Sequence, residues 1–310
     1  MESRGLGDVY KRQATDNTCI GYDAGTAIST GDYNTALGSY SLQANTTGGY
    51  NTGIGQGALK ANTTGQFNTA LGDNALLSAT TADKNTALGR SAMTNTTTGE
   101  NNTCVGQNAG ANITTTDYNT VVGSDALKTA TTTTKNTAIG YEALEATTTG
   151  SYNTAVGGYV MQQNTTGSNN TAVGEQALVA NTTGIQNTAI GRSALASNTT
   201  SNGSVAIGYN ALYANTYDNN MAIGREAGAA ITTGTRNIAI GNYALDANTT
   251  ASDNTAVGYN ALTTNTGANN TAVGKESLEA NTTGAQGVAV GRKALESNTT
   301  GDNNTAVGHY

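Results

Sequence analysis

The chain contains no proline and no tryptophan, one phenylalanine, one histidine and only 11% charged residues among its 310 positions. So few large apolar side chains cannot build a compact core of ordinary size, although they can build a thin core that repeats many times. The net charge of −7 provides no basic face for nucleic acid phosphates. No apolar run is long enough to cross a bilayer. We therefore expect no nucleic acid partner and no membrane insertion in this segment.

Residues that carry chemistry are equally scarce. Cys19 and Cys104 are the only cysteines, and the only histidine is His309. The two cysteines lie five repeats apart, which corresponds to about 24 Å at ~4.8 Å per strand and excludes a disulfide within the chain. No Ser-His-Asp or Cys-His arrangement, zinc site or phosphate-binding loop is present. We expect no enzyme activity, no cofactor and no metal.

The chain consists almost entirely of a seventeen-residue sequence repeat. The unit reads N-T-A-[VIL]-G-x-x-A-L-x-A-N-T-T-G-x-x, and Asn170 to Gln186 are a representative copy. The spacing falls to sixteen residues between Gly208 and Gly224 and between Gly258 and Gly274, where the N-T-T-G segment is shorter. A fixed short period predicts a stack of coils with a turn that can lose one residue.

The T-A-[VIL] segment of each unit predicts a short β-strand. Side chains alternate across a strand, so positions two and four share one face and position three takes the other. Position four is always aliphatic, and position two becomes Val205, Met221, Ile238 and Val288 in four copies. We therefore expect positions two and four to point into the coil. The following Gly predicts a turn with positive φ or close approach, and the A-L segment predicts a second apolar wall.

Positions nine and twelve compensate each other in volume. Three copies have Gly at position nine, and the same three have Ile rather than Asn at position twelve: Gly25 with Ile28, Gly110 with Ile113, and Gly228 with Ile231. An unfilled hole in a packed interior is destabilising, so both positions should border one interior space. The Asn that opens nearly every unit predicts a ladder of side chains along the axis. The fold class that we expect is all-β, a parallel β-solenoid (β-roll) of about eighteen coils.

Position three is Ala in most copies and, by alternation, should face outward. A long stripe of small apolar residues in water would be unusual and permits close approach of another chain. We therefore expect a homo-oligomer, a trimer or filament of copies of this chain, with position three at the interface. The predicted interface residues are Ala36, Ala70, Ala87, Ala138, Ala155, Ala172, Ala189, Ala206, Ala222, Ala239, Ala256, Ala272, Ala289 and Ala306.

The repeats define the predicted organisation of the chain, with a non-repeat segment at 1–16 and a continuous solenoid array at 17–310. The hexapeptide from Asp8 to Gln13 can be encoded by a DNA sequence that resembles a transposon end. Transposon ends of this kind are used to prepare sequencing libraries. We therefore expect the N-terminal segment to be a sequence artefact and exclude it from the fold.

Four strand segments carry a resemblance to a known family: Gly203–Gly208, Asn220–Gly224, Asn237–Gly241 and Gly287–Gly291. They resemble the S-V-A-I-G core of the head repeats of trimeric autotransporter adhesins, the YadA-like family. The longer N-T-A-[IV]-G-x-x-A-L-x-x-N-T-T-G pattern is similar to repeats of bacterial and phage tail-fibre-domain proteins. The resemblance implies a parallel β-roll in each chain, a trimer about a common axis, and an adhesive or fibre-shaft role outside the cell.

The expected function is an extracellular structural fibre or adhesin shaft, at a cell surface or in a virion fibre, that self-assembles without catalysis. One alternative is an ice-binding solenoid that uses the Thr rows of the N-T-T segments. Another is a carbohydrate-binding adhesin head, in which the residues before the Asn, such as Tyr33, Tyr50 and Phe67, stack on surface glycans. Several N-T-T segments also satisfy the N-x-[ST] glycan rule, namely at Asn45, Asn62, Asn95, Asn164, Asn181, Asn198, Asn248, Asn281 and Asn298.

Overall fold

The computed structural model describes residues 14–309, and the fold is all-β as expected. Each repeat contributes one three-residue strand, and the described residues contain no helix that could cross a membrane. The strands are β1 (Thr18–Ile20), β2 (Thr35–Leu37), β3 (Thr52–Ile54), β4 (Thr69–Leu71), β5 (Thr86–Leu88), β6 (Thr103–Val105), β7 (Thr120–Val122), β8 (Thr137–Ile139), β9 (Thr154–Val156), β10 (Thr171–Val173), β11 (Thr188–Ile190), β12 (Val205–Ile207), β13 (Met221–Ile223), β14 (Ile238–Ile240), β15 (Thr255–Val257), β16 (Thr271–Val273), β17 (Val288–Val290) and β18 (Thr305–Val307).

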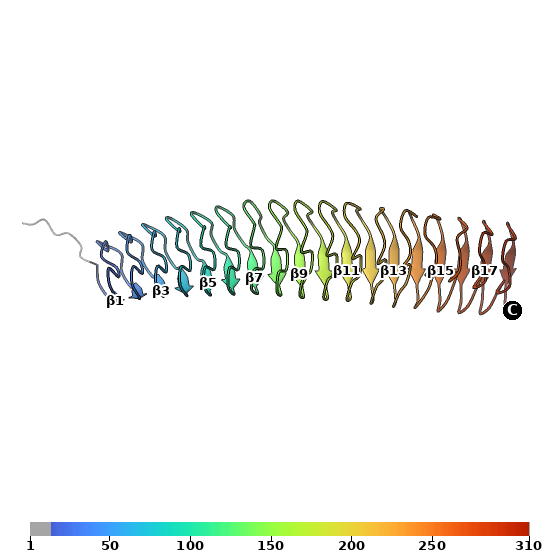
Figure 1. Cartoon of the computed structure of the whole chain (residues 1–310), viewed down its shortest axis with the longest axis horizontal. Helices are drawn as coiled ribbons and strands as arrows, with labels where there is room; N and C mark the ends of the chain where they lie inside the picture. Colours follow the sequence, from blue (N-terminus) through green and yellow to red (C-terminus); the bar gives the residue numbers. More distant parts are fainter. Residues whose placement is uncertain (1–13, 310) are drawn as a thin grey trace, which may run out of the picture. The chain divides into compact units, whose positions relative to one another are not determined.

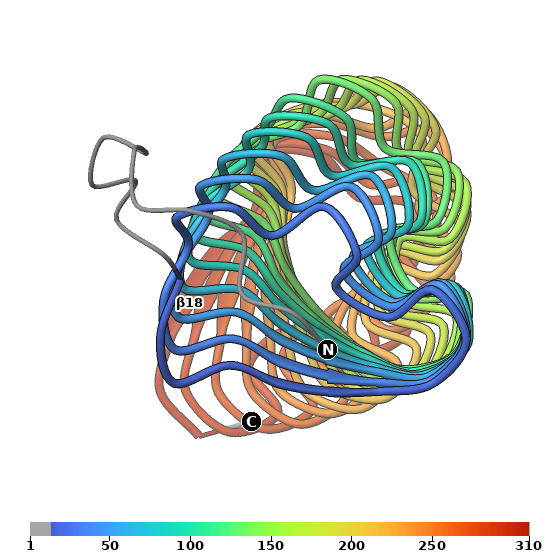
Figure 2. The same cartoon turned by 90° about the vertical axis from the view of Figure 1, so that its left-hand side faces the viewer.

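The chain divides after Thr115 into two compact units, the first with β1 to β6 and the second with β7 to β18. Within each unit, successive strands pair in parallel and residues at the same repeat position lie opposite each other, as Thr171 does with Thr188 (Figure 1). The coils of each unit follow one behind another in the view along the stack (Figure 2). The predicted parallel β-solenoid is thus confirmed for each unit. Residues 1–13, which hold most of the expected artefact, lie outside the described residues.

The two faces of each strand are the reverse of our prediction. Ala172 in β10 is fully buried inside its coil, whereas Thr171 is exposed and Val173 is half-exposed. The same order recurs in all eighteen strands except at the first and last, where position three is also open to solvent. Only residues up to the size of valine, as at Val121, occupy position three of the interior, because positions eight and nine of the preceding coil press against it. A Cβ atom added to Gly53 would lie 2.7 Å from Ser41 Oγ and 3.4 Å from Leu42 Cγ.

The predicted subunit interface at position three is therefore wrong. These alanines face the interior of their own chain and cannot meet a partner. The fully buried members are Ala36, Ala70, Ala87, Ala138, Ala155, Ala172, Ala189, Ala206, Ala222, Ala239, Ala256, Ala272 and Ala289, and Ala306 in the last coil is partly buried.

The glycine that follows each strand makes the predicted turn. Gly191 has φ 127°, and a Cβ atom there would lie 2.5 Å from the carbonyl oxygen of Gly208 in the next coil. Positive φ and close approach therefore both require glycine at position five. The chain then returns through Ala and Leu at positions eight and nine, which are buried, as Ala177 and Leu178 show. The predicted second apolar wall is confirmed.

The volume exchange between positions nine and twelve is confirmed by contact. A Cβ atom on Gly228 would lie 2.9 Å from Ile231 Cδ1, and one on Gly110 would lie 2.7 Å from Ile113 Cδ1. The isoleucine side chain therefore occupies the space that a position-nine leucine takes in the other coils. Both isoleucines are fully buried.

Asn at position one forms the predicted ladder inside the solenoid. The Asn170 side-chain amide donates to the carbonyl oxygen of Gly184, 2.8 Å away, and its Oδ1 accepts from the backbone N–H of Asn187, 2.9 Å away in the next coil. A second ladder, which we did not predict, runs through position twelve. There the Asn181 amide donates to Gly184 and to Asn164 Oδ1 of the preceding coil. Buried amides that are paired in this way specify the stacking register.

The two shortened coils lose their residue in the turn, as the spacing predicts. Position-twelve amides normally reach a carbonyl three residues ahead, but Asn215 and Asn265 reach Tyr217 and Gly267, two residues ahead. The strand register is unaffected, since Val205 still pairs with Met221. The shortening has a local cost: Nδ2 of Asn254, the position-one amide of the second short coil, is buried without a hydrogen-bond partner.

Candidate binding surfaces of the coils

The outward face of the strands is the largest regular surface of each unit. Positions two and four provide it, and no residue at either position is fully buried among the described strands. Position two is Thr in most strands and position four is always Val, Ile or Leu. None of these residues carries a charge, so the face consists of a hydroxyl row beside an aliphatic row.

Three neighbouring strands of the second unit replace the hydroxyl row with aliphatic side chains. We call this surface the aliphatic patch; it consists of Val205, Ile207, Met221, Ile223, Ile238 and Ile240 on β12, β13 and β14. Met221 at position two is 38% exposed, and its neighbours Ile223 and Ile238 are 36% and 37% exposed. A hollow of about 280 Å³ opens along one side of the patch, where Gly203 has no side chain to fill it. Exposed aliphatic groups gathered in this way mark interaction surfaces.

The threonine rows of the coil differ in how their hydroxyl groups are used. At position thirteen the hydroxyl donates to a Thr carbonyl of the next coil, as from Thr165 to Thr182 at 2.9 Å and from Thr182 to Thr199 at 2.9 Å. Position fourteen, such as Thr183, is exposed on the turn. At position two, no threonine hydroxyl of strands β7 to β11 makes a hydrogen bond to a protein group within the described chain. Of the two threonines in N-T-T segments such as those of Thr165 and Thr182, the first therefore uses its hydroxyl within the protein, and the second is exposed.

Most of the predicted glycan acceptors are buried, and this prediction is wrong for them. Their side-chain nitrogen, to which a glycan would be attached, points into the coil and bonds a turn carbonyl, as at Asn181. The fully buried acceptors are Asn45, Asn62, Asn164, Asn181, Asn198, Asn248 and Asn281. Asn95, at position eleven, is exposed, and Asn298 in the penultimate coil is half-buried. Glycosylation at these two residues stays a prediction.

Three aromatic side chains at position seventeen of consecutive coils stack on each other, whereas Tyr118 and Tyr152 lie in coils without an aromatic neighbour at this position. The rings of Tyr33 and Tyr50 lie 4.9 Å apart at 21°, and those of Tyr50 and Phe67 lie 5.0 Å apart at 10°. A sugar ring packs on the flat face of an aromatic ring, but here neighbouring rings cover those faces. Within this stack both faces of Tyr50 are covered, and Tyr33 and Phe67 each have one face covered. This arrangement does not favour the carbohydrate-stacking hypothesis.

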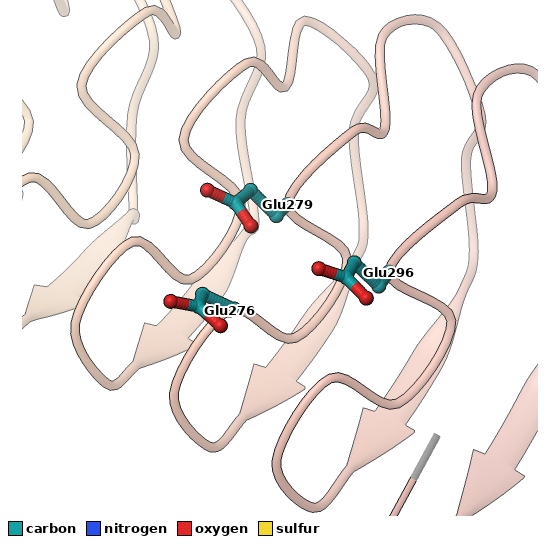
Figure 3. A group of neighbouring side chains, drawn as sticks. All are labelled: Glu276, Glu279 and Glu296. Atoms are coloured by element: carbon teal, nitrogen blue, oxygen red, sulfur yellow. The ribbon is translucent and has the colours of Figure 1, made fainter.

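Three carboxylates come together near the end of the second unit. One oxygen from each of Glu276, Glu279 and Glu296 lies within 4.8 Å of the others (Figure 3). Lys293 Nζ is 2.7 Å from Glu296 and 3.7 Å from Glu276, and a hydrogen bond from Lys275 lowers the pKa of Glu276. The ammonium groups of Lys275 and Lys293 thus already partner these carboxylates. We interpret the cluster as a surface ion-pair network, which contributes little to stability.

The two cysteines are both free thiols, in agreement with the predicted absence of a disulfide. Cys104 occupies position three of β6 and is fully buried, and burial raises its pKa far above the ordinary value. Cys19 occupies the same position in β1 and is exposed. A thiol that stays protonated is a poor nucleophile, so Cys104 behaves as a small apolar side chain of the interior.

Comparison with known proteins adds no assignment. No family model matches the chain, and no curated protein matches it in sequence.

Proposed function

We propose that the chain is an extracellular structural segment, of the fibre-shaft or adhesin type, that associates with copies of itself and presents a repetitive surface. The resemblance of the N-x-A-I-G segments to trimeric adhesin heads supports the location and the role. The observation that carries the self-association is the aliphatic patch on β12 to β14, whose side chains are half-exposed although they are as apolar as a core.

A second copy of the chain is the partner that fits this face best. Its strands repeat at the same ~4.8 Å spacing, so side chains of facing rows interdigitate over strand after strand. A partner without the repeat would match one row only. The six patch residues carry no charge, so no pair of like charges is buried where two patches meet. Association therefore uses positions two and four, not position three.

The area of the aliphatic patch determines how strong a self-association we expect. Three strands of about 10 Å length at ~4.8 Å spacing cover roughly 150 Å² of flat sheet, well below the ~800 Å² that each partner contributes to a standard interface. Neighbouring aliphatic rows at position four extend the contact. We expect an association that depends on concentration, with three copies as the resemblance implies.

Sedimentation velocity over a range of protein concentrations tests the proposal. The wild-type chain should shift from monomer to a larger species as concentration rises, and Met221→Lys/Ile238→Lys should stay monomeric. Thr137→Lys/Thr154→Lys is the matched control, because it adds the same charges at the same repeat position in β8 and β9, and it should still associate. A monomeric wild type at every concentration, or a patch variant that associates like wild type, would rule out self-association through this face.

A further inference from the structure

The hydroxyl groups of the threonine row of strands β7 to β11 have no hydrogen-bond partner among residues 14–309. Thr120, Thr137, Thr154, Thr171 and Thr188 occupy position two of consecutive strands and are exposed or half-exposed. Among the described residues, no protein group bonds their hydroxyls. Water is therefore left to satisfy these groups, which occupy the same position of five consecutive repeats.

The row belongs to a two-dimensional lattice rather than to a single line. Consecutive strands pair residue for residue, as Thr154 pairs with Thr171 and Val156 with Val173. Hydroxyl groups therefore repeat at ~4.8 Å along the stack, and a parallel row of aliphatic side chains lies about 6.6 Å away along the strand. Strands β8 to β11 are each paired on both sides, and β7 is paired with β8. A β-branched Thr is also stiff at χ1. The array is thus fixed before any ligand arrives.

We propose that the outward face of β7 to β11 binds the surface of an ice crystal. The hydroxyl row repeats at ~4.8 Å, close to a repeat of the oxygen atoms along an ice surface, so each hydroxyl can take the place of one lattice water. The methyl groups of Thr and the side chains of Val122, Ile139, Val156, Val173 and Ile190 fill the gaps between them. No charged side chain interrupts the face, and a charge would hold water in an orientation that ice does not use.

The exposed threonines of the turn do not form an equivalent surface. Thr149, Thr166 and Thr183 at position fourteen make one row only, because the neighbouring position-thirteen hydroxyls are bonded to carbonyl groups of the next coil. Position sixteen on the other side varies between coils, as Ser151, Ser168 and Ile185 show. The turn therefore lacks a second regular row.

Inhibition of ice recrystallisation by the full chain tests the proposal, with ice itself as the probe. The wild type should keep crystals small. The strand variant Thr137→Lys/Thr154→Lys/Thr171→Lys should lose the inhibition, and the turn variant Thr149→Lys/Thr166→Lys/Thr183→Lys, which carries the same charges in the same three coils, should retain it. Thr154→Tyr is a milder strand variant that adds bulk without charge and should weaken the inhibition. Circular dichroism should be the same for all four proteins.

Inactive wild-type protein would overturn the proposal. So would any pattern in which the turn variant loses inhibition, or in which the strand variants keep it. The patch variant Met221→Lys/Ile238→Lys should remain active toward ice, because its substitutions lie outside β7 to β11. Loss of ice binding and loss of self-association are thus distinguishable.

Discussion

The inner and the outer face of the same strands differ in which side chains they accommodate. Ala172 and Val173 are neighbours in β10, yet the smaller side chain is fully buried and the larger one is half-exposed. Inside, a replacement is accepted only where another residue gives way, as with Gly228 and Ile231. Outside, Thr, Val, Met and Ile all occur at position two, and each remains exposed or half-exposed. Size therefore limits the inner face, whereas the outer face is open to change for binding.

The largest effect should follow from a charge placed on the inner face. Ala172→Glu would bury an unpaired carboxylate and should cost about 3–5 kcal/mol of unfolding free energy. Val173→Glu, one residue later, should change it by less than about 1 kcal/mol because the side chain reaches water. Urea unfolding followed by circular dichroism measures both. Equal losses would mean that the two faces are not as different as we describe.

A smaller loss of unfolding free energy should follow when the side-chain volumes at positions nine and twelve no longer compensate each other. Ile231→Asn leaves the space beside Gly228 unfilled and should cost about 2–5 kcal/mol. The double variant Gly228→Leu/Ile231→Asn recreates the common pattern of the other coils, where leucine occupies position nine with φ near that of Gly228, as Leu245 does. It should recover most of the loss. A double-mutant cycle gives the coupling, and additive effects would contradict the shared interior space.

The asparagine ladder should respond differently in long and short coils. Asn170→Ser removes a bond to Gly184 in a coil of full length and should cost about 1–3 kcal/mol. Asn254→Ser removes an amide nitrogen that is already without a partner. The serine hydroxyl can still accept from the backbone N–H of Asn270, which now bonds Asn254 Oδ1, as Ser204 of the other short coil accepts from Asn220. This second substitution should be neutral or stabilising. Thermal unfolding of the two variants compares them, and similar losses would argue against the ladder.

The smallest effect concerns a charge at the rim of the coil. Burial, and then the nearby Glu226, raise the pKa of Asp246. The folded protein therefore holds this proton more tightly than the unfolded chain, so the stability that it contributes is present at acid pH and is lost as pH rises through the raised pKa. Asp246→Asn should stabilise the fold slightly at neutral pH and leave it unchanged in acid. Unfolding curves at the two pH values check the sign.

Much of this fold follows from the sequence alone. The period, the single strand per repeat, the turn at position five, the Asn ladder and the pairing of Gly228 with Ile231 were all predictable, because each rests on comparison among copies. The direction of the strand faces was not. Alternation tells which residues share a face but not which face is inside, and we placed the larger side chains inward. What decides the matter is the wall formed by positions eight and nine of the preceding coil, such as Ser41 and Leu42 beside Gly53, which leaves room opposite for side chains no larger than that of Val121.

Because the strand faces were assigned the wrong way round, the candidate binding surface was also predicted in the wrong place. The outward Thr and aliphatic rows were assigned to the core, and the N-T-T threonines were assigned to the surface. The hydroxyl of Thr165, however, is bonded to Thr182. Sequence shows that a row is regular, but the hydrogen-bond partner of each hydroxyl depends on how neighbouring coils stack.

Thiol labelling at adjacent residues tests the central claim most directly. Ala172→Cys and Val173→Cys, each in a chain whose own cysteines are replaced by alanine, place one thiol on either face of β10. The buried Cys104 shows that the inner position accommodates cysteine. In the folded protein a maleimide should modify the Val173→Cys thiol readily and the Ala172→Cys thiol only after denaturant is added. Faster labelling at position 172 than at position 173 would contradict the assignment of the two faces.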